Sequence, residues 1–278
     1  MPAERIAQNL AFINWTVLVG LAVGSFAAVV LARLRTDATR GFVAFTAACA
    51  LVLGLLGLAS DLGLPPSLVG SPIVADSSWD QPRRIALGLF CALAIGYAVA
   101  LARRRRAPLL AAGGLGAAGA TLAFGALGWG GTIVGAVPLL LQLVVLAAAT
   151  GGVFAAMILG HWYLVTPRLS ERPLVLFARI LTGIVAAQIT LFAVWVATGA
   201  GPGGSAPFGV LGGPWALFVW LRLLVGLVFP LVVSWAAIQT ARTRSMESAT
   251  GLLYIDVGAI AAGTILAAGL YFGAGLLV

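Results

Sequence analysis

Residues 133–165, IVGAVPLLLQLVVLAAATGGVFAAMILGHWYLV, decide the fold, because this long stretch holds one histidine and no Asp, Glu, Lys or Arg. An apolar run of about 20 residues crosses a bilayer as a helix. One helix over this stretch would be about 50 Å long, against a hydrocarbon core of about 30 Å. We therefore expect it to tilt, protrude or break. If it breaks, we expect the break at Thr150-Gly151-Gly152, where paired glycines favour either a kink or a discontinuous helix that lines a site, and the kink is the favoured alternative.

The whole chain has the composition of a membrane protein. It is 62% hydrophobic and 9% charged, whereas about a quarter of the residues of a soluble domain are charged. No polar block is large enough for a soluble domain, so we predict an all-α, polytopic bundle of eight transmembrane helices that forms a single membrane domain over 1–278. The first helix is longer than the apolar part of a signal peptide and is expected to be retained. The predicted helices cover residues 11–33, 42–60, 85–102, 108–128, 133–165, 174–199, 214–240 and 252–277.

Arginines indicate the orientation in the membrane. All sixteen basic residues are arginine. Three of them lie at the amino terminus or in the second link between helices, on one side of the membrane: Arg5, Arg83 and Arg84. Eleven others lie in or beside the first, third, fifth and seventh links: Arg33, Arg35, Arg40, Arg103, Arg104, Arg105, Arg106, Arg168, Arg172, Arg242 and Arg244. Positive residues favour the cytoplasmic side, so we expect both termini on the extracytoplasmic side of a cell membrane, the bacterial inner membrane. The alternation also supports an even number of helices.

The charges outside the helices bear on the partners of the chain. A net charge of +8 would suggest nucleic acid in a soluble protein. Here the arginines occupy short links, so we expect the lipid bilayer and no nucleic acid as the partner. The longest link, Asp61 to Arg84, is expected either to dock other subunits of a membrane complex or to serve as a plain connection.

Several ionisable residues are expected near the cytoplasmic ends of the helices. His161 and Tyr163 come at the end of the fifth helix, Arg179 about two turns into the sixth, and Asp256 about one turn into the eighth, with Glu247 just before it. They form either a proton- or ligand-handling site, or an interfacial belt in which Arg179 reaches the headgroups. Both alternatives stay open at this point.

Three polar residues are expected deeper in the membrane: Gln142, Gln188 and Arg222. An arginine at such depth costs a few kcal/mol on insertion scales unless it is solvated or paired. Arg222 is therefore expected either to bind an anionic or carbonyl-bearing ligand or to pair with Asp61, and pairing is the favoured alternative.

The residue inventory excludes several cofactors. A haem b with two histidine ligands needs a second histidine, and the Cys/His clusters of zinc sites are missing from the sequence. Quinone is the cofactor that remains compatible with the polar residues near the cytoplasmic face. The sequence also has no recognisable catalytic motif, which favours a non-catalytic subunit or a transporter over an enzyme.

Two functions follow as hypotheses. The first is a cofactor-free membrane subunit of a redox or electron-transfer complex that binds quinone near the cytoplasmic face, through His161, Tyr163, Arg179 and Asp256. In helix count and size the chain is similar to the quinone-handling membrane subunits of the polysulfide and dimethyl-sulfoxide reductase type, although it carries no motif of that family. The alternative is a small-solute transporter or channel with a polar path past Arg222, Gln142 and Gln188.

Overall fold

The computed structural model describes residues 1–166 and 169–278, so Pro167 and Arg168 of the predicted fifth link lie outside it. In this part of the chain the secondary structure is helical, without a β-strand. Eight of its helices are long and apolar enough to cross a membrane. The predicted all-α bundle of eight spans is therefore confirmed, because each apolar run satisfies its backbone hydrogen bonds within a helix.

The helices end within a few residues of the predicted positions, with larger differences at two starts: the third span is helical from Ser77 and not from residue 85, and the last helix also begins earlier than predicted. The last helix begins at Met246 and not at residue 252, because the Ala249 amide already donates to the Ser245 carbonyl (3.0 Å). It ends at Ala274, where Gly275 adopts a left-handed φ of 68°. The spans are α2 (Leu10–Arg35), α3 (Arg40–Leu62), η1 with α4 (Ser77–Trp79, Asp80–Ala102), α5 (Pro108–Trp129), α6 (Ile133–Val165), α7 (Arg172–Thr198), α8 with η3 and α9 (Ala216–Leu223, Leu224–Val228, Phe229–Arg242) and α10 (Met246–Ala274), and the short elements are α1 (Pro2–Gln8) and η2 (Gly209–Leu211).

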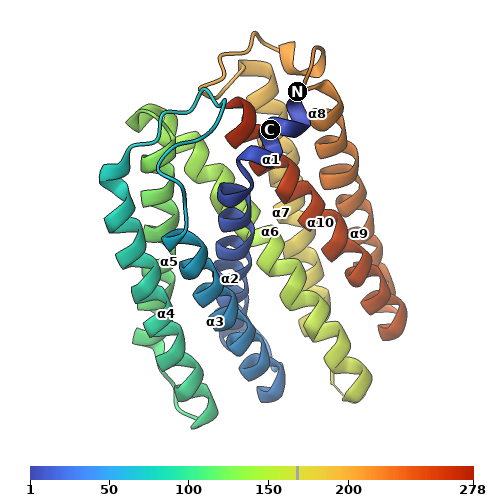
Figure 1. The fold of residues 1–278 in the computed structure, drawn as a ribbon. Helices are drawn as coiled ribbons and strands as arrows, with labels where there is room; N and C mark the ends of the chain where they lie inside the picture. Colours follow the sequence, from blue (N-terminus) through green and yellow to red (C-terminus); the bar gives the residue numbers. More distant parts are fainter. Residues whose placement is uncertain (167–168) are drawn as a thin grey trace.

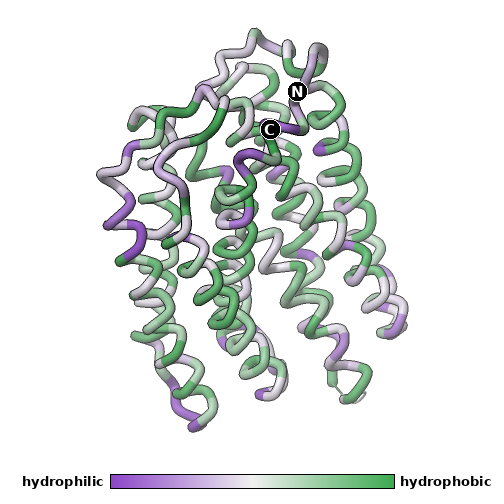
Figure 2. Tube along the Cα trace, viewed as in Figure 1, coloured by the Kyte–Doolittle hydropathy of each residue, from purple (hydrophilic) through white to green (hydrophobic). Residues whose placement is uncertain are grey.

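Both termini lie at one end of the bundle, which we call the terminal end (Figure 1). The opposite end carries the links 36–39, 103–107 and 243–245 and the described part of 166–171, and we call it the basic end. Hydrophilic residues lie mostly toward the helix ends, with apolar residues along the helix centres (Figure 2). This distribution is the one expected of a multi-pass membrane protein.

The bundle has two halves, α2–α5 and α6–α10, which meet where α2 packs on α6. At their crossing the backbones nearly touch. A Cβ on Gly24 would lie 1.9 Å from the Ala147 carbonyl oxygen, and one on Gly151 would lie 2.1 Å from the Ser25 amide nitrogen. Small residues permit this approach in a membrane, where packing rather than the hydrophobic effect holds helices together.

Helix α6 runs without interruption from Ile133 to Val165, the bounds that the sequence predicts. The alternative of a discontinuous helix broken at Thr150-Gly151-Gly152 is therefore wrong. Gly151 serves the contact with α2, and its neighbours on both sides keep helical hydrogen bonds, so the pair of glycines does not end the helix. The irregular backbone at membrane depth lies instead in the seventh span, where η3 is a π-helical turn.

Candidate functional site

The most unusual side chain of the second half is Arg222, on the last turn of α8. It is 2% exposed. Its Nη2 donates to Gln188 Oε1 at 2.6 Å, and its Nη1 donates to the Gly226 carbonyl at 3.2 Å. Among the described residues its Nε has no hydrogen-bond partner and the guanidinium forms no ion pair. A buried positive charge is therefore held by neutral groups alone.

The π-helical turn η3 and two glycines create the space for this guanidinium. A Cβ on Gly263 of α10 would lie 2.6 Å from the Gly226 Cα and 2.8 Å from Arg222 Nη1. Helix α10 and the turn η3 are thus in backbone contact beside the guanidinium. π-helical turns are rare, and they occur frequently at functional sites.

Gln188 links Arg222 to α6. Its Nε2 donates to the Val145 carbonyl at 3.0 Å while its Oε1 accepts from Arg222. Gln142 is also buried and precedes Val145 by about one turn of α6. Of the three predicted deep polar residues, the structure thus joins Arg222 and Gln188 directly and places Gln142 on the same stretch of α6.

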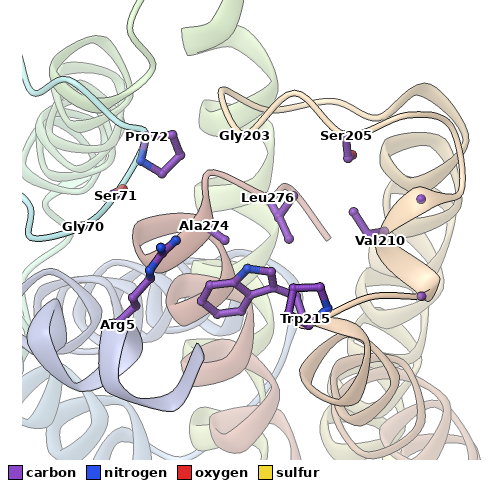
Figure 3. A pocket seen from close by; sticks show the side chains of 13 residues that line it. Arg5, Gly70, Ser71, Pro72, Gly203, Ser205, Val210, Trp215, Ala274 and Leu276 are labelled. Carbon is purple, nitrogen blue, oxygen red and sulfur yellow. The ribbon is translucent and has the colours of Figure 1, made fainter. Parts of the chain in front are cut away.

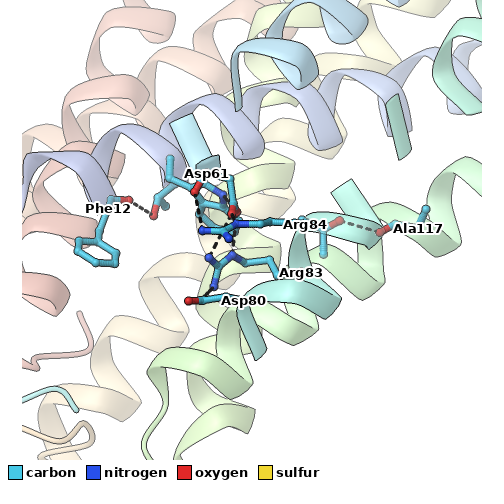
Figure 4. A network of polar contacts seen from close by, with 9 residues as sticks. Phe12, Asp61, Asp80, Arg83, Arg84 and Ala117 are labelled. Carbon is cyan, nitrogen blue, oxygen red and sulfur yellow. Dashed lines mark hydrogen bonds and ion pairs between the residues drawn. The ribbon is translucent and has the colours of Figure 1, made fainter. Parts of the chain in front are cut away.

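The favoured pairing of Arg222 with Asp61 is wrong, because Asp61 has other partners. Its carboxylate is fully buried and accepts from Trp15 Nε1 (2.7 Å) and Arg83 Nε (2.7 Å) in the first half of the bundle. It also accepts from Arg83 Nη2 (3.2 Å) and Arg84 Nε (3.1 Å), as Figure 4 shows for the two arginines. This buried ion cluster holds α2, α3 and α4 together at their terminal ends.

The link that was predicted to run from Asp61 to Arg84 is shorter in the structure. Asp61 belongs to α3 and Arg84 to α4, and the part of the link outside helices covers only 63–76. Asp76 ends this part: its carboxylate accepts from the Ser78 amide at 3.0 Å and so caps η1. Hydrogen bonding by the Ser78 side chain, followed by that of the Ser78 amide, lowers the pKa of Asp76. The exposed surface of this link is correspondingly smaller than the sequence suggested.

Asp256 lies deeper than predicted, because α10 begins earlier. It is about 15 Å from the first residue of the helix and is 0% exposed. Within the described residues neither carboxylate oxygen has a hydrogen-bond partner. Gly263 is seven residues further along, so Asp256 and the Arg222 contact point share one face of α10 about 10 Å apart.

The other predicted residues of the cytoplasmic layer do not reach Asp256. His161 and Arg179 are exposed on the surface of the bundle. Tyr163 is buried and its hydroxyl donates to the Ser170 carbonyl. The structure thus places these residues toward one end of their helices without bringing their side chains together around the carboxylate.

Two hollows lie near the polar residues of the second half. At the terminal end, a hollow of about 450 Å³ is lined by Arg5, Trp215 and backbone of the links 70–72 and 203–214. Figure 3 shows the Trp215 indole across its floor, between Arg5 and Val210. At the basic end, a hollow of about 530 Å³ is lined by Tyr163, Leu164 and residues 244–247.

The terminal hollow stands above the Arg222 site. Trp215 precedes α8, and Arg222 follows it by seven residues on the same helical face, about 10 Å deeper. Sequence reasoning missed this hollow because its walls come from α1, two links and the end of α10, which are far apart in the chain. It also missed Arg83 and Trp15 as partners of Asp61, for which no local pattern gives a signal.

Comparison with protein families, with curated proteins and with solved structures finds no match for this chain.

Proposed function

We propose that this protein is a transporter for a small anion, which binds at Arg222. The observation that carries the proposal is the buried guanidinium without a carboxylate partner. A charged side chain at membrane depth is costly and usually pairs, faces a path or binds a ligand. Among the described residues Arg222 has Gln188 and a backbone carbonyl as its partners, and its Nε has none. An oxygen-bearing anion would supply the missing negative charge and acceptors.

Access supports the same function. The terminal hollow is lined by a second arginine, Arg5, and by Trp215, which lies on the same face as Arg222 about 10 Å away along the helix. A positive residue at the mouth and another about 10 Å deeper would attract an anion and then desolvate it in two steps.

The proposal includes an orientation of the bundle in the membrane. With the basic end in the cytoplasm of a bacterial inner membrane, the terminal hollow opens on the extracytoplasmic side. The anion would then enter from outside, pass Gln188 and Gln142, and leave past Asp256 toward the basic end. Cysteine-accessibility labelling of single-cysteine variants in residues 103–106 tests the orientation, and labelling from the outside would contradict it.

Uptake into proteoliposomes tests the function. Purified protein would be reconstituted and supplied with labelled formate, acetate, bicarbonate, phosphate or sulfate in turn. Arg222→Gln keeps amide donors but removes the charge, and it should lower uptake of the transported anion at least about 10-fold. Arg179→Gln is the matched control, because Arg179 is exposed on α7. Equal uptake by the Arg222→Gln variant, or uptake of none of these anions, would contradict the proposal.

A second candidate function is a membrane subunit of a redox complex that binds quinone. The observation in its favour is the hollow at the basic end, where Tyr163 and the polar residues Arg244 and Glu247 surround space of about 530 Å³. His161 and Arg179 are exposed and available to a partner subunit, and the irregular part 63–76 offers a second docking surface. Copurification with redox subunits, and loss of quinol-dependent turnover in His161→Ala, would favour this function over transport.

A further inference from the structure

A separate hollow lies at the basic end of the first half, away from Arg222. It has a volume of about 770 Å³ and opens between the ends of α2 and α4 and the start of α5. Its rim carries Arg33, Arg105 and Arg106. Its inner wall lies on the membrane side of these arginines and is mostly apolar, with Tyr97 as its polar member. The apolar wall residues include Val30, Leu101, Ala111, Ala112 and Leu115.

The positive charge at this hollow is not compensated. A small adjoining hollow is lined by Arg33 and Arg105 together with Arg40 and Arg104, so five arginines meet in this region. Asp37 is the one carboxylate in the walls of the two hollows. Among the described residues none of the five arginine side chains forms an ion pair or hydrogen bond. Elsewhere in the bundle, Arg83 and Arg84 both form ion pairs with Asp61.

We propose that this hollow binds an anionic phospholipid. The phosphate would lie between Arg33, Arg105 and Arg106, where guanidinium groups can donate paired hydrogen bonds to its oxygens. An acyl chain would lie along the apolar wall toward Ala111 and Leu115. Basic pockets between membrane helices bind anionic headgroups in this manner. A free phosphate would contact only the arginines at the rim and would leave the apolar wall uncovered. We therefore favour a phospholipid over a free phosphate as the ligand.

Lipid titration followed by native mass spectrometry of the delipidated full chain tests the inference. The probes are phosphatidylglycerol, which is anionic, and phosphatidylcholine, which is zwitterionic, with the same acyl chains. Wild type should bind phosphatidylglycerol more tightly. The triple variant Arg33→Gln, Arg105→Gln, Arg106→Gln should weaken that binding about 100-fold.

The control variant removes the same charge outside the hollow: Arg35→Gln, Arg103→Gln, Arg242→Gln. It should keep at least most of the affinity, because those arginines do not line the hollow. An equal loss in both triple variants would overturn the proposal in favour of a general surface charge, and so would equal binding of the two lipids.

A third variant separates a lipid from a free phosphate. Ala111 is buried in the inner wall, and Ala111→Phe would fill the path of the acyl chain while leaving all arginines in place. The lipid site requires weaker phosphatidylglycerol binding in this variant. Unchanged binding, together with full displacement of the lipid by inorganic phosphate, would overturn it. Circular dichroism of each variant shows whether the helices are retained.

Discussion

Asp61→Asn tests whether the buried ion cluster holds the first half of the bundle together. Asp61 accepts from Trp15, Arg83 and Arg84, and both it and Arg83 are almost completely buried. An asparagine there has no charge and turns an NH₂ group toward guanidinium donors. Removing one partner of a buried pair costs about 3–5 kcal/mol. Arg84 is 32% exposed, so its share is screened and adds little.

The magnitude can be checked by unfolding the protein with SDS in mixed micelles. Trp15 and Trp129 both lie beside Arg83, whose guanidinium carbon is 4.7 Å from the centre of a Trp129 ring, so two of the chain's eight tryptophans report on the cluster within the total fluorescence. Asp80→Asn is the matched control: Asp80 is 34% exposed and pairs with the same arginine. It should cost no more than about 1 kcal/mol.

Two outcomes would refute this reasoning. The first is that Asp61→Asn costs no more than Asp80→Asn, which would mean that burial does not set the strength of the pair. The second is that the double variant Asp61→Leu, Arg83→Leu is as unstable as the single variant Asp61→Leu. We expect the double variant to recover stability, because replacing both buried charges by apolar groups removes the desolvation cost of each.

Two further predictions concern α6 and α10. Gly151→Ala should greatly weaken or abolish folding, because its Cβ would lie 2.1 Å from the Ser25 nitrogen, whereas the Cβ of Gly152→Ala meets no atom within 4 Å and should stabilise the helix by about 0.5–1 kcal/mol. Size-exclusion profiles and SDS unfolding compare the two variants. Similar behaviour of both would contradict the close crossing of α2 and α6 at Gly151. Asp256→Leu should raise the free energy of unfolding by about 1–3 kcal/mol, since it removes a buried carboxyl without partners; a loss of stability would mean that Asp256 has a partner in the folded protein.

The two halves of the bundle treat their charges differently. In α2–α4, the buried Asp61 and Arg83 satisfy one another. In α6–α10, Arg222 and Asp256 are buried without an ion pair among the described residues. Compensated charges stabilise a structure, while uncompensated ones are retained at a cost in stability and occur at functional sites. This contrast is the reason for placing the proposed anion path in the second half.

The sequence by itself determined the number of spans and the distribution of arginines between the two ends. Each depends on one segment at a time, because an apolar run in lipid must satisfy its own backbone and can do so only as a helix. The same local reasoning placed Arg222, Gln188 and Asp256 within spans. It placed Asp256 too near the helix end, since a helix continues through polar residues wherever its backbone bonds continue.

Only the tertiary structure decided which polar groups meet. Asp61 was expected to pair with Arg222 and instead binds Arg83 and Arg84, because pairing depends on which helices are neighbours and how each is rotated. The π-helical turn η3 likewise lies where Gly226 contacts Gly263 of α10, a helix crossing that the sequence does not indicate. Such crossings join residues far apart in the chain, and hydropathy, which averages over neighbours, carries no information about them.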